Sequence, residues 1–202
     1  MPNNLYLSFY GCSSVSIQTD RARIICDPWF DTPAYEGTWI PKMNVLNWVK
    51  KIGDCDGIYV SHIHPDHYDS KTLKKLFDFY GEKQIIIADW GKTKGGFLQK
   101  KMQSDGFAHL LKVSNSFNFG NTIVHIIPND TGSISDIDTA IFVYSNEYKK
   151  SVLNVNDCIF NESLFNKIIN LKQKLNVEIS LFCLGYTGAG PYPQTYYSPF
   201  VE

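Results

Sequence analysis

The chain has 202 residues and a formal net charge of −1 at pH 7, with 44% hydrophobic and 14% aromatic residues. This length is typical of one domain with a sizeable core, and the composition excludes a disordered chain. The near-zero charge argues against a nucleic acid or an anionic membrane surface as the partner.

The N-terminus, Met1-Pro2-Asn3-Asn4, has no basic leader region, and no apolar run approaches membrane-spanning length. The cysteines are scattered and form no CxxC pair; they are Cys12, Cys26, Cys55, Cys158 and Cys183. We therefore expect reduced thiols in a cytoplasmic protein with no membrane partner. Cys26 and Cys158 lie next to aspartates, but small buried residues at strand ends remain the better interpretation of both.

The first half of the chain begins with strand-like apolar runs, and Gly11 and Thr19-Asp20 provide turns between them. Asp69-Ser70 is an N-cap signal, and the apolar spacing that follows predicts a helix. We expect strands at 5–10, 14–18, 23–26, 58–61 and 84–88. We expect helices near 45–52, after Asp69, and over 96–104.

The second half has the same character. We expect strands at 122–127, 140–145 and 151–155, and a last buried strand over 177–184. A helix is predicted over 161–175, with these residues facing inward: Leu164, Phe165, Ile168, Ile169 and Leu171. Strands with helices in each half, and no linker or repeat, predict one α+β domain over 1–202, with two sheets packed face to face and helices outside.

The segment Ser61-His62-Ile63-His64-Pro65-Asp66-His67 carries the strongest chemical signal. Imidazoles and carboxylates are ligands of divalent zinc, iron or manganese. His62 and His64 are two residues apart, so in an extended segment they lie on one side and can bind one metal. Asp66 and His67 follow the turn and can reach a second metal. A polar loop that is rich in histidine by chance is the weaker interpretation, because this spacing rarely arises from composition alone.

Three aspartates at the ends of apolar runs could complete such a site: Asp27, Asp130 and Asp157. Each alone would be interpreted as a turn or cap residue, but charged ligands are needed where strand ends converge. Asp136 and Asp138 are weaker candidates. His109 and His125 lie in or beside apolar runs and are interpreted as core or surface histidines.

The histidine segment resembles the HxHxDH signature of the metallo-β-lactamase superfamily, and Asp27 and Asp157 fit the same pattern. Several short pieces resemble, more narrowly, the metallo-β-lactamase-like part of the CMP-N-acetylneuraminate hydroxylase family. These pieces are 27–35, 59–62, 72–76, 138–141, 153–158 and 188–193, and the likeness runs from about Leu5 to Tyr197.

The resemblance implies an αββα sandwich with one or two divalent transition metals. His62 and His64 would bind the first metal, Asp66 and His67 the second, and Asp157 would bridge them. Asp27 would orient the loop by hydrogen bonds. The superfamily has a further histidine between HxHxDH and the bridging aspartate, and we expect Asp130 to take its place.

The chain departs from the resembled pattern in two ways. No histidine follows His125, where the superfamily has its last ligand. The loop 185–192 stands there instead, and its glycines fit either a substrate pocket or a plain turn. The paired cysteines and histidines of a Rieske centre are also missing from this chain. The chain stops soon after this loop, which is consistent with a natural short form or a truncated C-terminus.

Three functions remain open. The first is a hydrolase in which a metal-activated water attacks a phosphodiester, nucleotide-sugar or ester, with Asp66 as base if it is not a ligand. The second is a non-haem iron oxygenase that acts on a nucleotide-linked sugar and needs an external reductase. The third is a metal-binding relic without catalysis. The first two require a small-molecule substrate.

Overall fold

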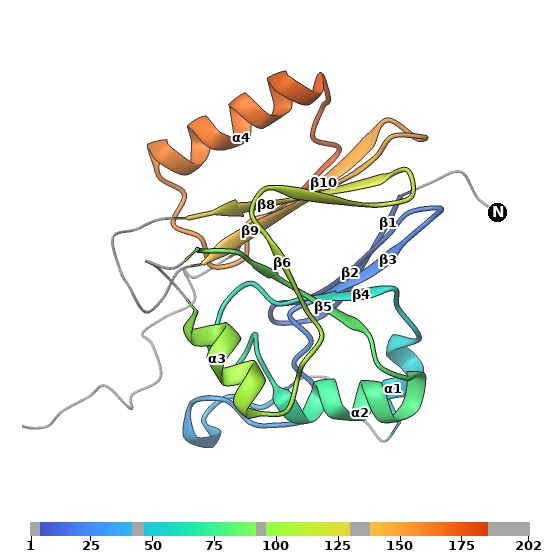
Figure 1. The fold of residues 1–202 in the computed structure, drawn as a ribbon, viewed down its shortest axis with the longest axis vertical. Coiled ribbons are helices and arrows are strands. Elements are labelled where there is room, and N and C mark those ends of the chain that lie inside the picture. The colour runs from blue at the N-terminus through green and yellow to red at the C-terminus, as the bar shows by residue number, and fades with distance from the viewer. Residues whose placement is uncertain (1–4, 42–46, 92–95, 130–137, 186–202) are drawn as a thin grey trace, which may run out of the picture.

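The structure is a computed structural model and describes residues 5–41, 47–91, 96–129 and 138–185. Two sheets pack face to face with helices on both outer sides (Figure 1), which is the predicted αββα sandwich. The helices are α1 (Trp48–Ile52), α2 (Ser70–Tyr80), α3 (Phe97–Ser104) and α4 (Glu162–Leu175), with a short 3-10 turn at Tyr35–Gly37.

The first sheet has the strand order β1-β2-β3-β4-β5-β6. Its strands are β1 (Tyr6–Gly11), β2 (Ser14–Gln18), β3 (Arg23–Cys26), β4 (Gly57–Tyr59), β5 (Gln84–Ala88) and β6 (Leu110–Val113). The first three strands are antiparallel, and β3 to β6 run parallel. The carboxyl ends of β3, β4 and β5 therefore meet at one edge, where loops can carry function.

The second sheet has the order β11-β10-β9-β8-β7. Its strands are β7 (Ser116–Phe119), β8 (Thr122–Pro128), β9 (Thr139–Ser145), β10 (Lys150–Asn154) and β11 (Leu181–Cys183). All neighbours are antiparallel except β10 and β11. The start of β9 and the end of β10 thus lie together, because Ile141 pairs with Asn154.

Side-chain alternation along the strands separates the layers of the core. On β9, Ile141 and Val143 face the other sheet, whereas Phe142 packs against Leu164 and Ile168 of α4. Alternation of this kind is the rule for a strand that is buried on both faces. In β4, Tyr59 faces the other sheet and Ile58 faces the helical layer below.

Four expectations about elements need correction. The strand predicted over 177–184 was wrong as a buried strand, because β11 spans only three residues and Leu181 and Phe182 are 40% and 41% exposed. Phe165 is 48% exposed instead of inward-facing, because a helix turns about 100° from the buried Leu164 to the next residue. Strands β6 and β7 were missed, because their short runs contain polar residues. The strand before the histidine segment was predicted to end at Ser61, but β4 ends two residues earlier, at Tyr59.

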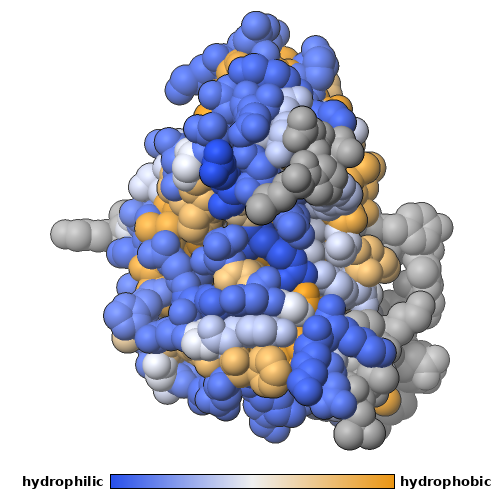
Figure 2. Space-filling view, turned by 90° about the vertical axis from the view of Figure 1, so that its right-hand side faces the viewer, coloured by the Kyte–Doolittle hydropathy of each residue, from blue (hydrophilic) through white to orange (hydrophobic). Residues whose placement is uncertain are grey.

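The face seen in Figure 2, which looks onto the side of the hairpin turns in Figure 1, is mainly hydrophilic with scattered apolar spots. Among the described residues, no helix is both long enough and apolar enough to cross a bilayer. The site described next lies at the other edge, where β4 and β10 end.

Candidate metal centre

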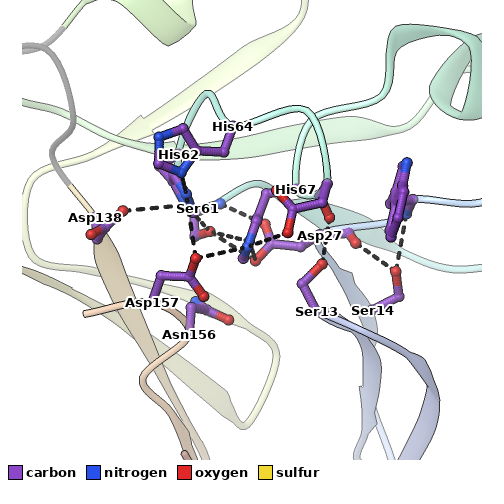
Figure 3. A network of polar contacts seen from close by, with 12 residues as sticks. Ser13, Ser14, Asp27, Ser61, His62, His64, His67, Asp138, Asn156 and Asp157 are labelled. Carbon is purple, nitrogen blue, oxygen red and sulfur yellow. Dashed lines mark hydrogen bonds and ion pairs between the residues drawn. The ribbon is translucent and has the colours of Figure 1, made fainter. Parts of the chain in front are cut away.

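Loops from both sheets converge at one edge of the sandwich (Figure 3). His62, His64, Asp66 and His67 follow β4, and Asp157 follows β10, so the fold brings together the histidine segment and the strand-end aspartate. His62, Asp66 and His67 are almost fully buried, whereas the side chain of Asp157 is 40% exposed. The cluster therefore combines an enclosed set of donors with one open side.

Asp27 organises the histidines. Its carboxylate is fully buried, and it accepts hydrogen bonds from the backbone N–H of Ser61 (2.7 Å), the Ser61 hydroxyl (2.8 Å) and His67 Nδ1 (3.0 Å). Because the Ser61 hydroxyl donates to Asp27, its oxygen is free to accept from His62 Nδ1, which lies 2.9 Å away. The pattern assigns a proton to Nδ1 of both histidines.

This assignment decides which atoms can bind a metal. With Nδ1 protonated, the lone pairs of His62 and His67 are on Nε2, and both Nε2 atoms face Asp157, at 3.9 and 3.3 Å from its Oδ2. A carboxylate that fixes the tautomer of a ligating histidine is the usual arrangement around protein-bound metals. Asp27 thus forms the kind of hydrogen bonds that the family resemblance implied for it, and its functional role stays a prediction.

The surroundings of His62 and His67 shift the pKa values of the two imidazoles in opposite directions. Burial and the neighbouring imidazoles of His67 and His64 lower the pKa of His62 to about 2, so this ring is neutral and keeps its lone pair. Burial by itself would lower the pKa of His67, but the carboxylates of Asp27 and Asp157 outweigh it and raise that pKa well above its usual value. A proton on His67 Nε2 occupies the place that a cation would take.

The distances fit a cation between the side chains. Two ligand atoms about 2.1 Å from one tetrahedral ion lie about 3.4 Å apart. His67 Nε2 lies 3.3 Å from Asp157 Oδ2 and 3.7 Å from Asp66 Oδ2, close to that spacing. His62 Nε2 and His64 Nδ1 are 2.7 Å apart, a hydrogen-bond distance, so these rings must separate slightly around an ion.

The donor set therefore fits one or two divalent metals. In the described part of the chain, ligand atoms of His62, His64 and Asp157 lie within 4.8 Å of one another. Asp66 and His67 extend the cluster, because His67 Nε2 lies near both Asp66 Oδ2 and Asp157 Oδ2. One carboxylate oxygen of Asp157, Oδ2, thus lies near Nε2 of both His62 and His67, where a ligand shared by two metals would lie. Which of these residues bind a metal stays a prediction.

The remaining sequence candidates fall into three groups. Asp130 and Asp136 lie outside the described residues. Asp138 reaches the site, because its Oδ1 lies 3.4 Å from His62 Nδ1. His109 is exposed and His125 is half-buried on β8, so the structure does not place either among these ligands.

Several contacts of the site were missed from the sequence. The Tyr35 hydroxyl donates to Asp66 Oδ1 (2.8 Å), and the Ser13 hydroxyl donates to the Asp66 carbonyl (2.6 Å). The Cys12 thiol lies 3.8 Å from Asp66 Oδ2. An ideal Cβ on Gly185 would lie 2.6 Å from the carbonyl oxygen of Asn156, so this glycine lets two chain segments meet beside Asp157. Cys12 and Ser13 occupy the turn after Gly11, and this glycine was the one sequence signal that marked a loop at that position.

The two cysteines beside the aspartates are buried, as small residues at strand ends would be. Cys26 is fully buried and Cys158 is 8% exposed, and burial raises the pKa of both thiols. A protonated thiol is a poor metal ligand. All five cysteines are free in the structure.

Comparison with known proteins places this geometry in context. The family model described as the beta-lactamase superfamily domain matches residues 6–139. A protein of Mycobacterium tuberculosis that carries the name of a Rieske 2Fe-2S iron–sulfur protein is 28% identical over 200 residues, covering 94% of this chain and 36% of its own. The cytidine monophosphate-N-acetylneuraminic acid hydroxylase of Sus scrofa is 28% identical over 144 residues, covering 67% of this chain and 31% of its own.

The chain thus spans about a third of the length of these curated relatives. A solved structure described as a possible metal-dependent hydrolase from Veillonella parvula matches with a TM-score of 0.63 and 13% identity, covering 87% of this chain and 70% of that one. At this identity the match supports the fold alone.

Proposed function

Because the chain belongs to the beta-lactamase superfamily domain family, we propose that it is a metal-dependent hydrolase with a two-metal centre. The observation that carries the proposal is the position of Asp157, whose Oδ2 lies 3.9 Å from His62 Nε2 and 3.3 Å from His67 Nε2. The substrate is a small molecule with a phosphodiester, nucleotide-sugar or ester bond, and we place the reaction in the cytoplasm.

A divalent ion bound here would lower the pKa of a coordinated water to near 7 and polarise the scissile oxygen. His62 and His64 hold one position, and His67 with Asp66 holds the other. Asp157 is the most exposed of these ligands, so its carboxylate can also accept a hydrogen bond from an attacking water. Asp27 contacts no solvent and acts through the two imidazoles: it holds a proton on Nδ1 of each ring, directly for His67 and through the Ser61 hydroxyl for His62, so that Nε2 is the nitrogen available to a metal.

Asp66 is better suited to binding a metal than to accepting a proton. Its Oδ1 already accepts from Tyr35, and its Oδ2 faces His67 Nε2 at 3.7 Å. Asp130 remains the proposed substitute for the superfamily's additional histidine.

The curated relatives favour a second candidate, a non-haem iron oxygenase. One relative is named as a hydroxylase of a CMP-linked sugar and another as a Rieske iron–sulfur protein. The histidine and carboxylate donors also suit iron. For this function, an external reductase must deliver electrons to the site.

One experiment separates the two candidates. The protein is loaded separately with zinc, manganese and ferrous iron, and each form is assayed with phosphodiester and ester model substrates. Oxygen uptake with a reductant and a CMP-linked sugar is followed in parallel, with the His62→Ala/His64→Ala variant as control. Hydrolysis that depends on zinc or manganese supports the proposal. Iron-dependent oxygen uptake coupled to sugar hydroxylation, without hydrolysis under any metal, replaces it by the second candidate. A chain that takes up no metal refutes both.

A further inference from the structure

Tyr35 reaches the candidate metal centre from a segment that the histidine pattern does not include. Its hydroxyl donates to Asp66 Oδ1 at 2.8 Å. The other carboxylate oxygen, Oδ2, then faces His67 Nε2 at 3.7 Å. Ser13 holds the main chain of the same residue through the Asp66 carbonyl (2.6 Å). Both the backbone and the side-chain rotation of Asp66 are therefore fixed by contacts from outside its own loop.

The loop that carries Tyr35 is itself anchored to helix α2. The buried carboxylate of Asp69, which caps this helix, accepts from the backbone N–H groups of Asp31 (3.2 Å) and Thr32 (2.9 Å) and from the Thr32 hydroxyl (2.8 Å). Lys75 of α2 forms an ion pair with Asp31 at 2.5 Å. These bonds hold the loop against the same helix that follows the histidine segment.

The backbone at Tyr35 is strained. Tyr35 and Glu36 have φ angles of 48° and 56°, in the left-handed region that bulky residues rarely adopt. The bridge between Ala34 and Trp39 closes the turn, and the Tyr35 ring packs edge-on against Trp39 at 5.0 Å. Strained residues persist where surrounding contacts determine them, and they cluster at functional sites. Here the strained residue is the one whose hydroxyl reaches Asp66.

We propose that Tyr35 is a positioning residue of the second metal position, where it holds the Asp66 carboxylate so that Oδ2 faces the ion shared with His67 and Asp157. The inference rests on the two-metal centre proposed above. Tyr35 acts through Asp66 and has no part in binding the ion at His62 and His64. Hydrogen-bonding partners of metal ligands typically contribute about 10–100-fold to metal affinity.

The test compares Tyr35→Phe with a matched control, Tyr68→Phe. Tyr68 also donates its hydroxyl to a carboxylate, Asp105 Oδ2, at 2.7 Å, but that pair lies outside the site. Both substitutions remove only the hydroxyl, so the ring contact of Tyr35 with Trp39 is kept. Zinc and manganese binding is measured by calorimetry and by metal analysis after dialysis. Cobalt substitution adds a visible spectrum that reports the ligands of each position.

We expect wild type to bind two ions, and Tyr35→Phe to bind the second ion about 10–100-fold more weakly. The first ion should bind Tyr35→Phe as it binds wild type, and the metal-free melting temperature should change no more than in Tyr68→Phe. Asp66→Asn should weaken the same position, and adding Tyr35→Phe to it should cost little more.

Two results would overturn the inference and leave the two-metal centre standing: a second ion that binds Tyr35→Phe with wild-type affinity, or equal losses of metal affinity in Tyr35→Phe and Tyr68→Phe. A wild-type chain that binds a single ion would overturn both the inference and the second metal position. A wild-type chain that binds no metal would overturn the proposed function as well.

Discussion

Replacing Asp27 by Asn tests the hydrogen-bond network at the centre of the site. The change keeps the size of the side chain, and Asn tolerates the left-handed φ of 45° at this position. The backbone N–H of Ser61 needs an acceptor at Oδ1 (2.7 Å), so the Asn carbonyl takes that place and its NH₂ group takes the place of Oδ2. That NH₂ group then points at the Ser61 hydroxyl and His67 Nδ1, where the carboxylate accepted from both.

Two tautomers should change as a result. His67 Nδ1 becomes an acceptor, so its proton moves to Nε2. The Ser61 hydroxyl loses its acceptor and donates to His62 Nδ1 at 2.9 Å, which moves that proton to Nε2 as well. Both Nε2 lone pairs that face Asp157 are lost to the metal. We expect metal affinity to fall by about 10–100-fold at each position.

The effect on folding should be smaller. The three charge-assisted hydrogen bonds to the Asp27 carboxylate become neutral ones, each weaker by about 1 kcal/mol. The metal-free protein should therefore lose about 1–3 kcal/mol in the free energy of unfolding, measured by urea titration. The matched control is Asp105→Asn, which weakens a tyrosine–carboxylate bond outside the site.

Calorimetry with zinc or manganese measures the affinity, and NMR of the imidazole nitrogens reports the tautomers. If Asp27→Asn binds both ions as tightly as wild type, the tautomer argument is wrong. If Asp105→Asn loses metal equally, the loss does not come from the site.

Three further perturbations have definite expected outcomes. His62→Ala combined with His64→Ala should abolish binding at the first position, because both donor nitrogens disappear; retained stoichiometry in metal analysis would contradict the assignment. Gly185→Ala should weaken metal binding measurably by calorimetry, because its Cβ would lie 2.6 Å from the Asn156 carbonyl and force the Asp157 loop to move; unchanged affinity would show that the loop yields elsewhere. Leu73→Ala should lower the free energy of unfolding in urea by about 2–5 kcal/mol, because removing this fully buried side chain leaves a cavity under the first sheet; a loss below 1 kcal/mol would show that the surrounding core residues close over the cavity.

Most elements could be predicted from local sequence signals. The N-caps Asp69 and Asn161 stand at the starts of α2 and α4, where their side chains accept backbone hydrogen bonds. The apolar runs of β5 and β9 have strand length and composition, so they were predicted from pattern alone. The prediction of a buried strand failed at β11. An apolar run indicates that a strand tends to be buried, but it does not tell whether the strand lies inside a sheet or at its edge. Among the described strands, β11 pairs only with β10.

For the site, the sequence by itself determined the histidine segment, because ligands two to five residues apart must lie close in space. It also indicated Asp27 and Asp157, since carboxylates at strand ends converge at a sheet edge. Only the tertiary structure decided which hydrogen bonds connect these aspartates to the histidines. The protons that Asp27 fixes on His62 and His67 depend on contacts across 34 and 40 residues of chain. The hydroxyl of Tyr35 reaches Asp66 because Asp69 holds the intervening loop, and no local pattern encodes hydrogen bonds that form only when distant segments pack together.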